Sequence, residues 1–305
     1  MTFISLLAAL LLDQWRPLRV SNRVHGAFGR YVTMLSSTFN RGQYRDGVIS
    51  WVLAVAPFAL GVMILYWALR HASGMLAVLL NIAVLYIALG FRQFSHFYTD
   101  VMQALRTADL ARAREILGAW RGKSTREFSD HEIACVAIEQ GLVRAHRHVF
   151  GVMAWFVLLG PAGAIIYRIA ALLNDRWSPG SGAPDDPYGL FASRAYTVID
   201  WVPARLTAIS FAVAGDFMGA VECWREQAAS WRSQSQGIVL AAAAGALGIR
   251  LGGVLHEVDG IEYRPQLGDG DEADVDFMQA AIGLAWRAWV LWMFLVLLVT
   301  IASWF

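Results

Sequence analysis

The chain has 305 residues, of which 57% are hydrophobic and only 16% are charged. This composition is too apolar for an ordinary soluble domain and predicts an integral membrane protein. The formal net charge of +1 gives no basic field, and the arginines are scattered rather than clustered with stacking aromatics, so we expect no nucleic-acid partner. Cys135 and Cys223 have neither metal-ligand spacing nor the setting of a disulfide framework.

Apolar runs in the first third of the chain predict how it enters the membrane. Residues 3–12 are too few for a full span, which needs about 20 residues, so we expect a half-span or interfacial helix there. A charged leader and a cleavage site are missing around this run, which argues against a removed signal peptide. Residues 51–69 and 73–91 are separated by a very short polar break and predict a tight transmembrane hairpin.

The later spans are residues 149–173, interrupted at Gly160-Pro161, and residues 288–305. The sequence leaves open whether residues 202–217 cross the membrane as well. We therefore expect an all-α, polytopic integral membrane protein with four or five transmembrane helices and helical extramembrane segments, in a single domain over residues 1–305.

Arginine placement predicts the orientation of the chain. Residues 13–50 and 92–147 flank the hairpin and are rich in arginine, so both should lie in the cytoplasm. Residues 92–147 then form a cytoplasmic helical insert, and residues 222–285 form a second extramembrane region whose side depends on the open crossing. The expected location is the bacterial inner membrane, with lipid as a partner and homo-oligomerisation left open.

Five segments, in the same order along the chain, resemble the CobD/CbiB family of membrane proteins, the adenosylcobinamide-phosphate synthases of cobalamin biosynthesis. They are Thr-Ala-Asp-Leu-Ala-Arg-Ala-Arg at 107–114, Leu-Gly-Pro at 159–161 with Tyr-Arg at 167–168, Asp-Trp-Val-Pro-Ala-Arg-Leu at 200–206, Ala-Gly-Ala-Leu-Gly-Ile-Arg-Leu-Gly-Gly at 244–253 and Leu-Gly-Asp-Gly at 267–270. The resemblance runs from residue 10 to about residue 285, and the segment at 244–253 is close to letter-for-letter.

The chain also departs from the family where the family carries acids and amides. Counted without gaps from Glu139, the family's Glu-Asn and Asp-Gly fall on Val143, Arg144, Arg147 and His148. Its Asn-Thr-Leu-Asp falls on residues 171–174, its Leu-Asp-Asp falls on residues 195–197 with tyrosine at 196, and the asparagine of its signature becomes Asp200.

These departures bear on the function that the resemblance implies. Joining a corrin carboxylate to an aminopropanol phosphate with a nucleotide's help needs carboxylates to hold a metal and to deprotonate an amine. The AmpE branch, associated with signalling of β-lactamase induction, shares the aspartate form of the signature. The sequence therefore predicts a diverged, non-catalytic AmpE-like protein, with an amide-forming synthase of altered active site as the alternative.

The binding residues expected from these patterns are Glu139, Arg144, Arg147, His148, Asp200, Arg205 and Arg250. Asp200 and Arg205 flank Pro203. Either Asp200 caps the start of a helix, or the two residues form a charged pair that faces a polar cavity. The basic cluster from Arg144 to His148 is either a positive-inside anchor or a pocket for an anionic, phosphate-bearing ligand.

No metal site or cofactor is predicted. His146 and His148 are two residues apart and would lie on different faces of a helix. The acidic run from Asp269 to Asp276 lacks the terminal glutamate of a calcium loop, so we interpret it as a solvated loop.

Overall fold

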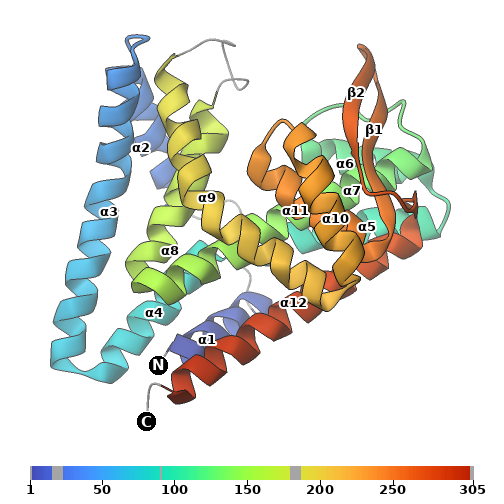
Figure 1. Cartoon of the computed structure of the whole chain (residues 1–305). Coiled ribbons are helices and arrows are strands. Elements are labelled where there is room, and N and C mark those ends of the chain that lie inside the picture. The colour runs from blue at the N-terminus through green and yellow to red at the C-terminus, as the bar shows by residue number, and fades with distance from the viewer. Residues whose placement is uncertain (1, 16–22, 90, 179–186, 303–305) are drawn as a thin grey trace. The chain divides into compact units, whose positions relative to one another are not determined.

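The structure is a computed structural model that describes residues 2–15, 23–89, 91–178 and 187–302, so Arg16 and Arg19 of the predicted cytoplasmic segment 13–50 lie outside it. The chain divides into two compact units, which are described separately. Unit 1 contains residues 1–91, 147–203 and 302–305, and unit 2 contains residues 92–146 and 204–301. Both units are built mainly of helices (Figure 1).

Unit 1 is a helical bundle around a small apolar core. Its helices are α1 Thr2–Trp15, α2 Arg23–Phe39, α3 Tyr44–Ala72, α4 Gly74–Ala88, the π-helix η1 His146–Phe150, α8 Gly151–Trp177 and the first part of α9 Pro187–Ala214. Buried side chains of α2, α3, α8 and α9 meet in one cluster, which consists of Val32, Leu35, Ala54, Val55, Ile169, Leu173, Trp177, Tyr188 and Ala192.

The predicted interruption in the third span is confirmed. Gly160 has a φ of 67° and a ψ of −155° inside α8, a conformation that favours glycine, and Pro161 follows it. Gly163 packs so closely that a Cβ there would collide with the Trp155 carbonyl. The break therefore redirects α8 without ending it.

Among the described residues, four stretches are long and apolar enough to cross a membrane, which confirms the polytopic, predominantly helical fold class. They are Tyr44–Ala72, the continuous stretch Asp130–Trp177, Pro187–Ala214 and Val275–Ala302. Only 17% of the apolar window in Tyr44–Ala72 and 22% of that in Val275–Ala302 is buried, as expected of faces that contact lipid. The N-terminal run and the second arm of the predicted hairpin form shorter helices, α1 and α4.

Unit 2 contains helices and a small sheet. Its elements are α5 Phe91–Arg106, α6 Leu110–Arg121, α7 Asp130–Ala145, the end of α9, α10 Phe217–Gln227, the 3-10 turn η2 Ala228–Ser230, α11 Gln234–Leu247, β1 Ile249–Glu257, β2 Gly260–Leu267, β3 Asp271–Glu272 and α12 Val275–Ala302. The strand order is β2-β1-β3, with β1 antiparallel to β2 and parallel to β3.

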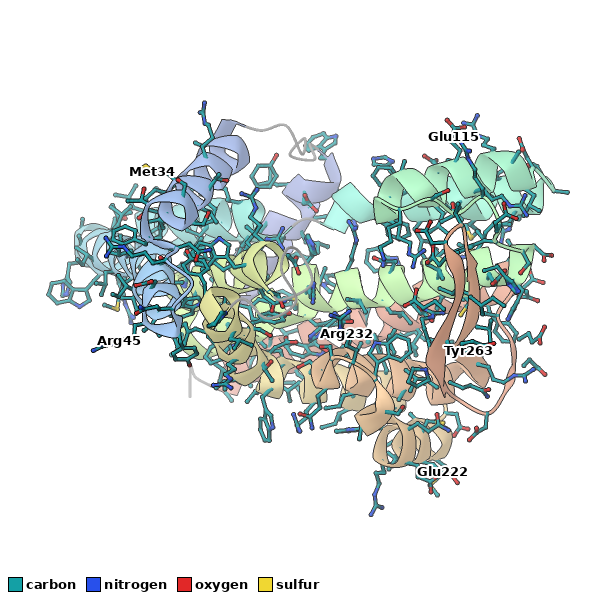
Figure 2. All side chains as sticks on the ribbon, turned by 90° about the horizontal axis from the view of Figure 1, so that it is seen from above. Met34, Arg45, Glu115, Glu222, Arg232 and Tyr263 are labelled. Carbon is teal, nitrogen blue, oxygen red and sulfur yellow. The ribbon has the colours of Figure 1, made fainter. Side chains whose placement is uncertain are left out.

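The sheet is an addition to the predicted helical extramembrane segments. Its hairpin turns next to Asp259-Gly260, a dipeptide that commonly closes two-residue hairpins, and Glu257 pairs with Gly260. A register shift between Gly252 and Gly253 leaves Pro265 of β2 without a partner in β1 and marks a bulge in β2. Both glycines have positive φ. Tyr263 on β2 is 78% exposed (Figure 2), whereas Leu251 and Leu255 of β1 and Leu267 of β2 are buried.

Unit 2 also brings together the two regions that were predicted to lie outside the membrane. Arg121 of α6 makes a 2.7 Å ion pair with Glu257 of β1, and Glu139 of α7 accepts a hydrogen bond from the Gly252 amide at 2.7 Å. Segments that share such contacts lie on one side of a membrane, so the chain between them crosses the membrane an even number of times. This arrangement favours the crossing that the sequence left open.

Candidate functional site

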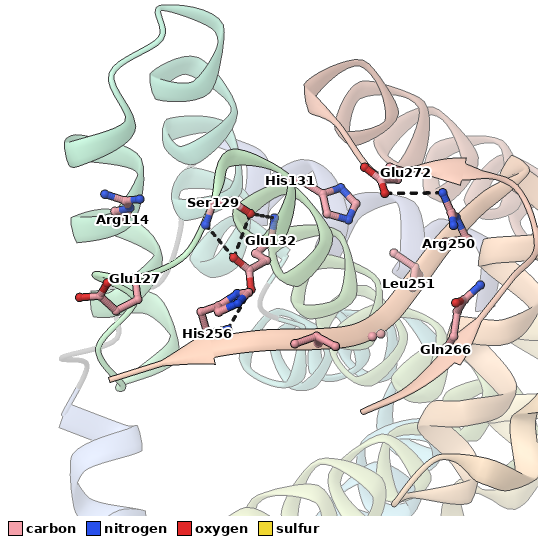
Figure 3. Close-up of a pocket in the computed structure, with 13 residues that line it drawn as sticks. Arg114, Glu127, Ser129, His131, Glu132, Arg250, Leu251, His256, Gln266 and Glu272 are labelled. Carbon is pink, nitrogen blue, oxygen red and sulfur yellow. Dashed lines mark hydrogen bonds and ion pairs between the residues drawn. The ribbon is translucent and has the colours of Figure 1, made fainter. Parts of the chain in front are cut away.

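A polar cavity of about 580 Å³ lies within unit 2, between the start of α7 and the sheet (Figure 3). We call it the sheet pocket. Its lining combines residues of both extramembrane regions, namely Arg114, Glu127, Ser129, His131, Glu132, Arg250, Leu251, Gly252, Gly253, Val254, His256, Gln266 and Glu272. The pocket therefore exists only because the hairpin packs against α7.

Glu132 is held firmly at one wall of the sheet pocket. It forms a capping box with Ser129 at the start of α7, in which its Oε2 accepts from the Ser129 amide at 2.7 Å. Its Oε1 accepts from the His256 amide at 2.8 Å and lies 2.8 Å from His256 Nδ1. The Glu132 side chain is 8% exposed, whereas that of His256 is 57% exposed. Both oxygens of the Glu132 carboxylate are thus hydrogen-bonded, while the His256 imidazole remains accessible to solvent.

The Glu132–His256 pair has the geometry of an oriented base. When Nδ1 of His256 donates to the carboxylate, the ring is fixed and Nε2 carries the lone pair that can accept a proton. A carboxylate behind an imidazole is a recurring arrangement for proton transfer in enzymes. His131, on the same wall, has its Nδ1 2.7 Å from the Ala273 carbonyl instead, so a backbone group and not a carboxylate orients it.

Two guanidinium groups flank this pair in the sheet pocket (Figure 3). Arg114 donates from Nε to the Phe128 carbonyl at 2.8 Å, which positions its side chain. Arg250 Nη2 lies 3.6 Å from Glu272 Oε1, and the Arg250 side chain is 43% exposed. Guanidinium groups beside a polar cavity suit phosphate or carboxylate ligands, because their planar fork can bind two oxygens at once.

The hairpin that carries His256 is fastened to α7 by a buried ion pair. Arg264 donates from Nη1 to Glu139 Oε2 at 2.6 Å and from Nη2 to the Gly252 carbonyl at 3.1 Å. Burial disfavours the charged form of Arg264, but the Glu139 carboxylate outweighs burial and raises the pKa of Arg264 above its ordinary value. The Arg264 guanidinium also lies over the Trp231 ring, 5.7 Å from its centroid.

Residues 244–253, the segment that most closely resembles the family, form the end of α11 and the start of β1 beside the sheet pocket. Gly245 lies so close to the Gly219 carbonyl that no side chain fits, which allows α10 and α11 to pack tightly. Gly248 ends α11 with a φ of 66°, and the chain then enters β1. Arg250 to Gly253 follow at once and line the sheet pocket.

A second polar cluster lies within unit 1, among η1, α8 and α9. The Tyr167 hydroxyl donates to Asp200 Oδ1 at 2.8 Å and lies 3.4 Å from the Tyr196 hydroxyl. Arg147 donates to Asp175 Oδ1 at 2.8 Å, and its guanidinium lies 5.4 Å from the Tyr196 ring centroid. We call Arg147, Tyr167, Asp175, Tyr196 and Asp200 the tyrosine cluster. Ionisable groups at membrane depth commonly mark functional sites.

The structure places Asp200 in the middle of α9, so the helix-start cap predicted for it is wrong. α9 continues through Pro203 because a side chain satisfies the carbonyl that proline leaves without its helical donor. That carbonyl belongs to Ile199, and the Trp155 indole donates to it at 3.0 Å. Arg205 lies on the same helix, half-buried, and its pairing with Asp200 stays a prediction.

Within each unit, the residues of the predicted basic cluster contact different partners and do not form a common binding surface. Arg144 donates to the Trp120 carbonyl at 3.3 Å and lies over the Trp120 ring in unit 2. In unit 1, Arg147 belongs to the tyrosine cluster, and His148 Nε2 lies 3.4 Å from Arg168 Nη1. Of the seven predicted binding residues, Arg250 lines the sheet pocket and Glu139 anchors its hairpin.

Sequence reasoning missed the residues that define the sheet pocket. Ser129 and Glu132 carry the spacing of a capping box, which signals a helix start but not a partner 124 positions away. His256 lies in a β-hairpin, in a region where the sequence predicted helical segments. As for metals, no cluster of three or more histidine, cysteine or acidic side chains with suitable geometry occurs among the described residues, and we assign no step to a metal ion.

These observations define a class: a multi-pass membrane protein with a polar pocket built from the two chain regions on either side of α8 and α9. The family described as CobD/Cbib protein matches residues 6–285, and the chain belongs to this family. No solved structure gives a significant match.

Curated relatives carry the same family name. The cobalamin biosynthesis protein CobD of Stutzerimonas stutzeri is 35% identical over 301 residues, which cover 97% of each chain. That of Chromobacterium violaceum is 34% identical, covering 81% of this chain and 77% of its own. That of Mycobacterium tuberculosis is 27% identical, covering 85% and 83%. The AmpE-like placement expected from the sequence finds no support among these relatives.

Proposed function

We propose that this chain acts in cobalamin biosynthesis as an amide-forming synthase with an altered active site. The relatives named for that pathway support the proposal, because they match between 81% and 97% of the chain. The observation that carries it within the molecule is the lining of the sheet pocket. The segment closest to the family in sequence supplies Arg250 to a cavity that also holds an oriented imidazole.

The chemistry of amide formation fits these groups. An amine attacks an activated carboxylate, the new carbon–nitrogen bond forms, the activating group leaves with its electron pair, and the nitrogen loses a proton. In this proposal His256 Nε2 accepts that proton, and Glu132 keeps the imidazole oriented. Arg114 and Arg250 bind the phosphate of the amine substrate through charge-assisted hydrogen bonds. The nucleotide supplies the activation and is a substrate of the reaction.

Complementation tests this proposal directly. A bacterial strain that lacks its own adenosylcobinamide-phosphate synthase should regain growth that depends on cobalamin synthesis when it expresses this chain. The Arg250→Ala variant should fail at equal membrane abundance, whereas Arg232→Ala, at an exposed arginine of unit 2, should rescue (Figure 2). No rescue by the intact, membrane-inserted chain would contradict the proposal.

A second candidate function is a binding or signalling role without catalysis, as in the AmpE branch. One observation favours it. Positions 147 and 196, where the resembled family carries aspartates, are Arg147 and Tyr196 here and form a cation–π contact in the tyrosine cluster. At these two positions, the acidic side chains of the family are replaced by a cationic and an aromatic side chain. Failure of complementation together with normal folding would support this candidate over the synthase.

A further inference from the structure

Unit 1 contains an apolar cavity of about 570 Å³ between α2, α3, α4 and α8. This volume is within the range of roughly 300–1,000 Å³ that small-molecule pockets occupy. Phe28, Tyr31 and Phe58 form one wall, where the Phe58 ring packs edge to face with Phe28 and with Tyr31, at centroid distances of 5.3 and 5.9 Å. Edge-to-face packing keeps such a wall rigid.

One charged side chain lines this cavity, and it belongs to Arg168 of α8. Its Nη1 lies 3.4 Å from His148 Nε2, and its Nε has no hydrogen-bond partner within the described chain. No carboxylate of the described residues comes within 4 Å of the guanidinium. A cation in an apolar membrane segment is costly unless an anion or water reaches it. The cavity thus offers a positive charge to whatever fills it.

The position of Arg168 along α8 indicates the depth of that charge. Asp175, whose side chain is 55% exposed, lies seven positions further along the helix, which corresponds to about 10 Å. The polar end of α8 therefore lies about two turns beyond the guanidinium. An arginine at this depth can meet the headgroup of a lipid whose acyl chain extends into the apolar part of the cavity.

We propose that this cavity binds a phospholipid with an acidic headgroup, which pairs an anionic oxygen with Arg168 and places an acyl chain against Phe28, Phe58 and Ile165. Charge complementarity selects the acidic class, because Arg168 is the cation of an otherwise apolar lining. This binding does not depend on the synthase activity proposed above and holds for either candidate function.

Native mass spectrometry of the purified full chain with added lipid tests the proposal. The wild-type chain should bind phosphatidylglycerol about tenfold more tightly than phosphatidylcholine, because the choline ammonium of phosphatidylcholine offsets the phosphate charge that Arg168 pairs with. Arg168→Gln should remove this preference, and Arg168→Lys should keep most of it. Val62→Phe, which fills the cavity, should weaken the binding of both lipids.

Arg45→Gln is the matched control, because Arg45 is an exposed arginine of the same unit outside the cavity (Figure 2). It should leave the preference unchanged. Equal binding of the two lipids by the wild-type chain would overturn the proposal. So would an undiminished preference in a folded Arg168→Gln variant, or a corrinoid absorbance band from the purified protein that disappears in the Val62→Phe variant.

Discussion

The two polar regions of this protein differ in how their charges are satisfied. In the sheet pocket and the anchor of its hairpin, the carboxylates of Glu132 and Glu139 accept hydrogen bonds from backbone amides and basic side chains, while the His256 side chain stays 57% exposed. In unit 1, polar groups are buried in membrane-spanning helices, and Arg168 faces an apolar cavity. We propose proton transfer in contact with solvent for the first region and ligand binding for the second.

Topology provides the largest expected effect, because it is all-or-none. The sheet pocket requires the insert containing Lys123 and the hairpin containing Asp259 to lie on one side of the membrane. Single cysteines at these positions, in a chain with both native cysteines replaced by serine, should be labelled from the same side. Membrane-impermeant maleimide in intact cells and in inverted vesicles measures this. Opposite labelling would separate the two halves of the pocket and contradict its existence.

Loss of the Glu139 anchor should produce the largest change in stability. Glu139→Ala leaves Arg264 buried without its carboxylate, at a cost of about 3 to 5 kcal/mol. We expect a lower melting temperature in detergent and faster proteolysis of the hairpin. Glu262→Ala is the control, since Glu262 is 48% exposed and lies 3.9 Å from Arg121, a pair worth at most about 1 kcal/mol. Equal effects of the two changes would show that the hairpin does not depend on the anchor.

The tyrosine cluster should tolerate removal of one hydroxyl better. Tyr167→Phe deletes the donor to Asp200 and should destabilise the chain by about 1.5 to 3 kcal/mol, the usual range for a hydrogen bond to a charged group. Tyr263→Phe, at an exposed tyrosine, should have no measurable effect. Thermal unfolding of both variants measures the difference. If they unfold alike, the Tyr167–Asp200 hydrogen bond does not hold this cluster together.

The sequence predicts the spans better than the sites because hydrophobic length is a local property. The break at Gly160-Pro161 could be located from two residues, since a proline next to a glycine disturbs a helix wherever it lies. The role of Glu139 could not be located in this way. Its partners Gly252 and Arg264 are more than a hundred positions away, and only the folded hairpin brings them together.

Asp200 shows that a local sequence signal can also predict a feature that the folded chain does not have. An aspartate three positions before a proline resembles a helix start, and local rules alone favour that interpretation. The helix continues because Trp155, on another helix, donates to the Ile199 carbonyl. Tertiary contacts of this kind override local signals, and one sequence without relatives cannot reveal them. Arg250 could be predicted because it stands inside a segment that resembles the family almost letter for letter.

The most direct test of the proposed function is the rate of amide formation by purified protein in lipid nanodiscs, with a corrin carboxylate, aminopropanol phosphate and nucleotide. The wild-type chain should form the amide, and His256→Gln should lower kcat by about 10² to 10⁴, the contribution of a positioned base. His131→Gln, which removes the imidazole oriented by a backbone carbonyl, should change kcat far less. Undiminished activity of a folded His256→Gln variant would contradict the assignment of the sheet pocket as the catalytic site.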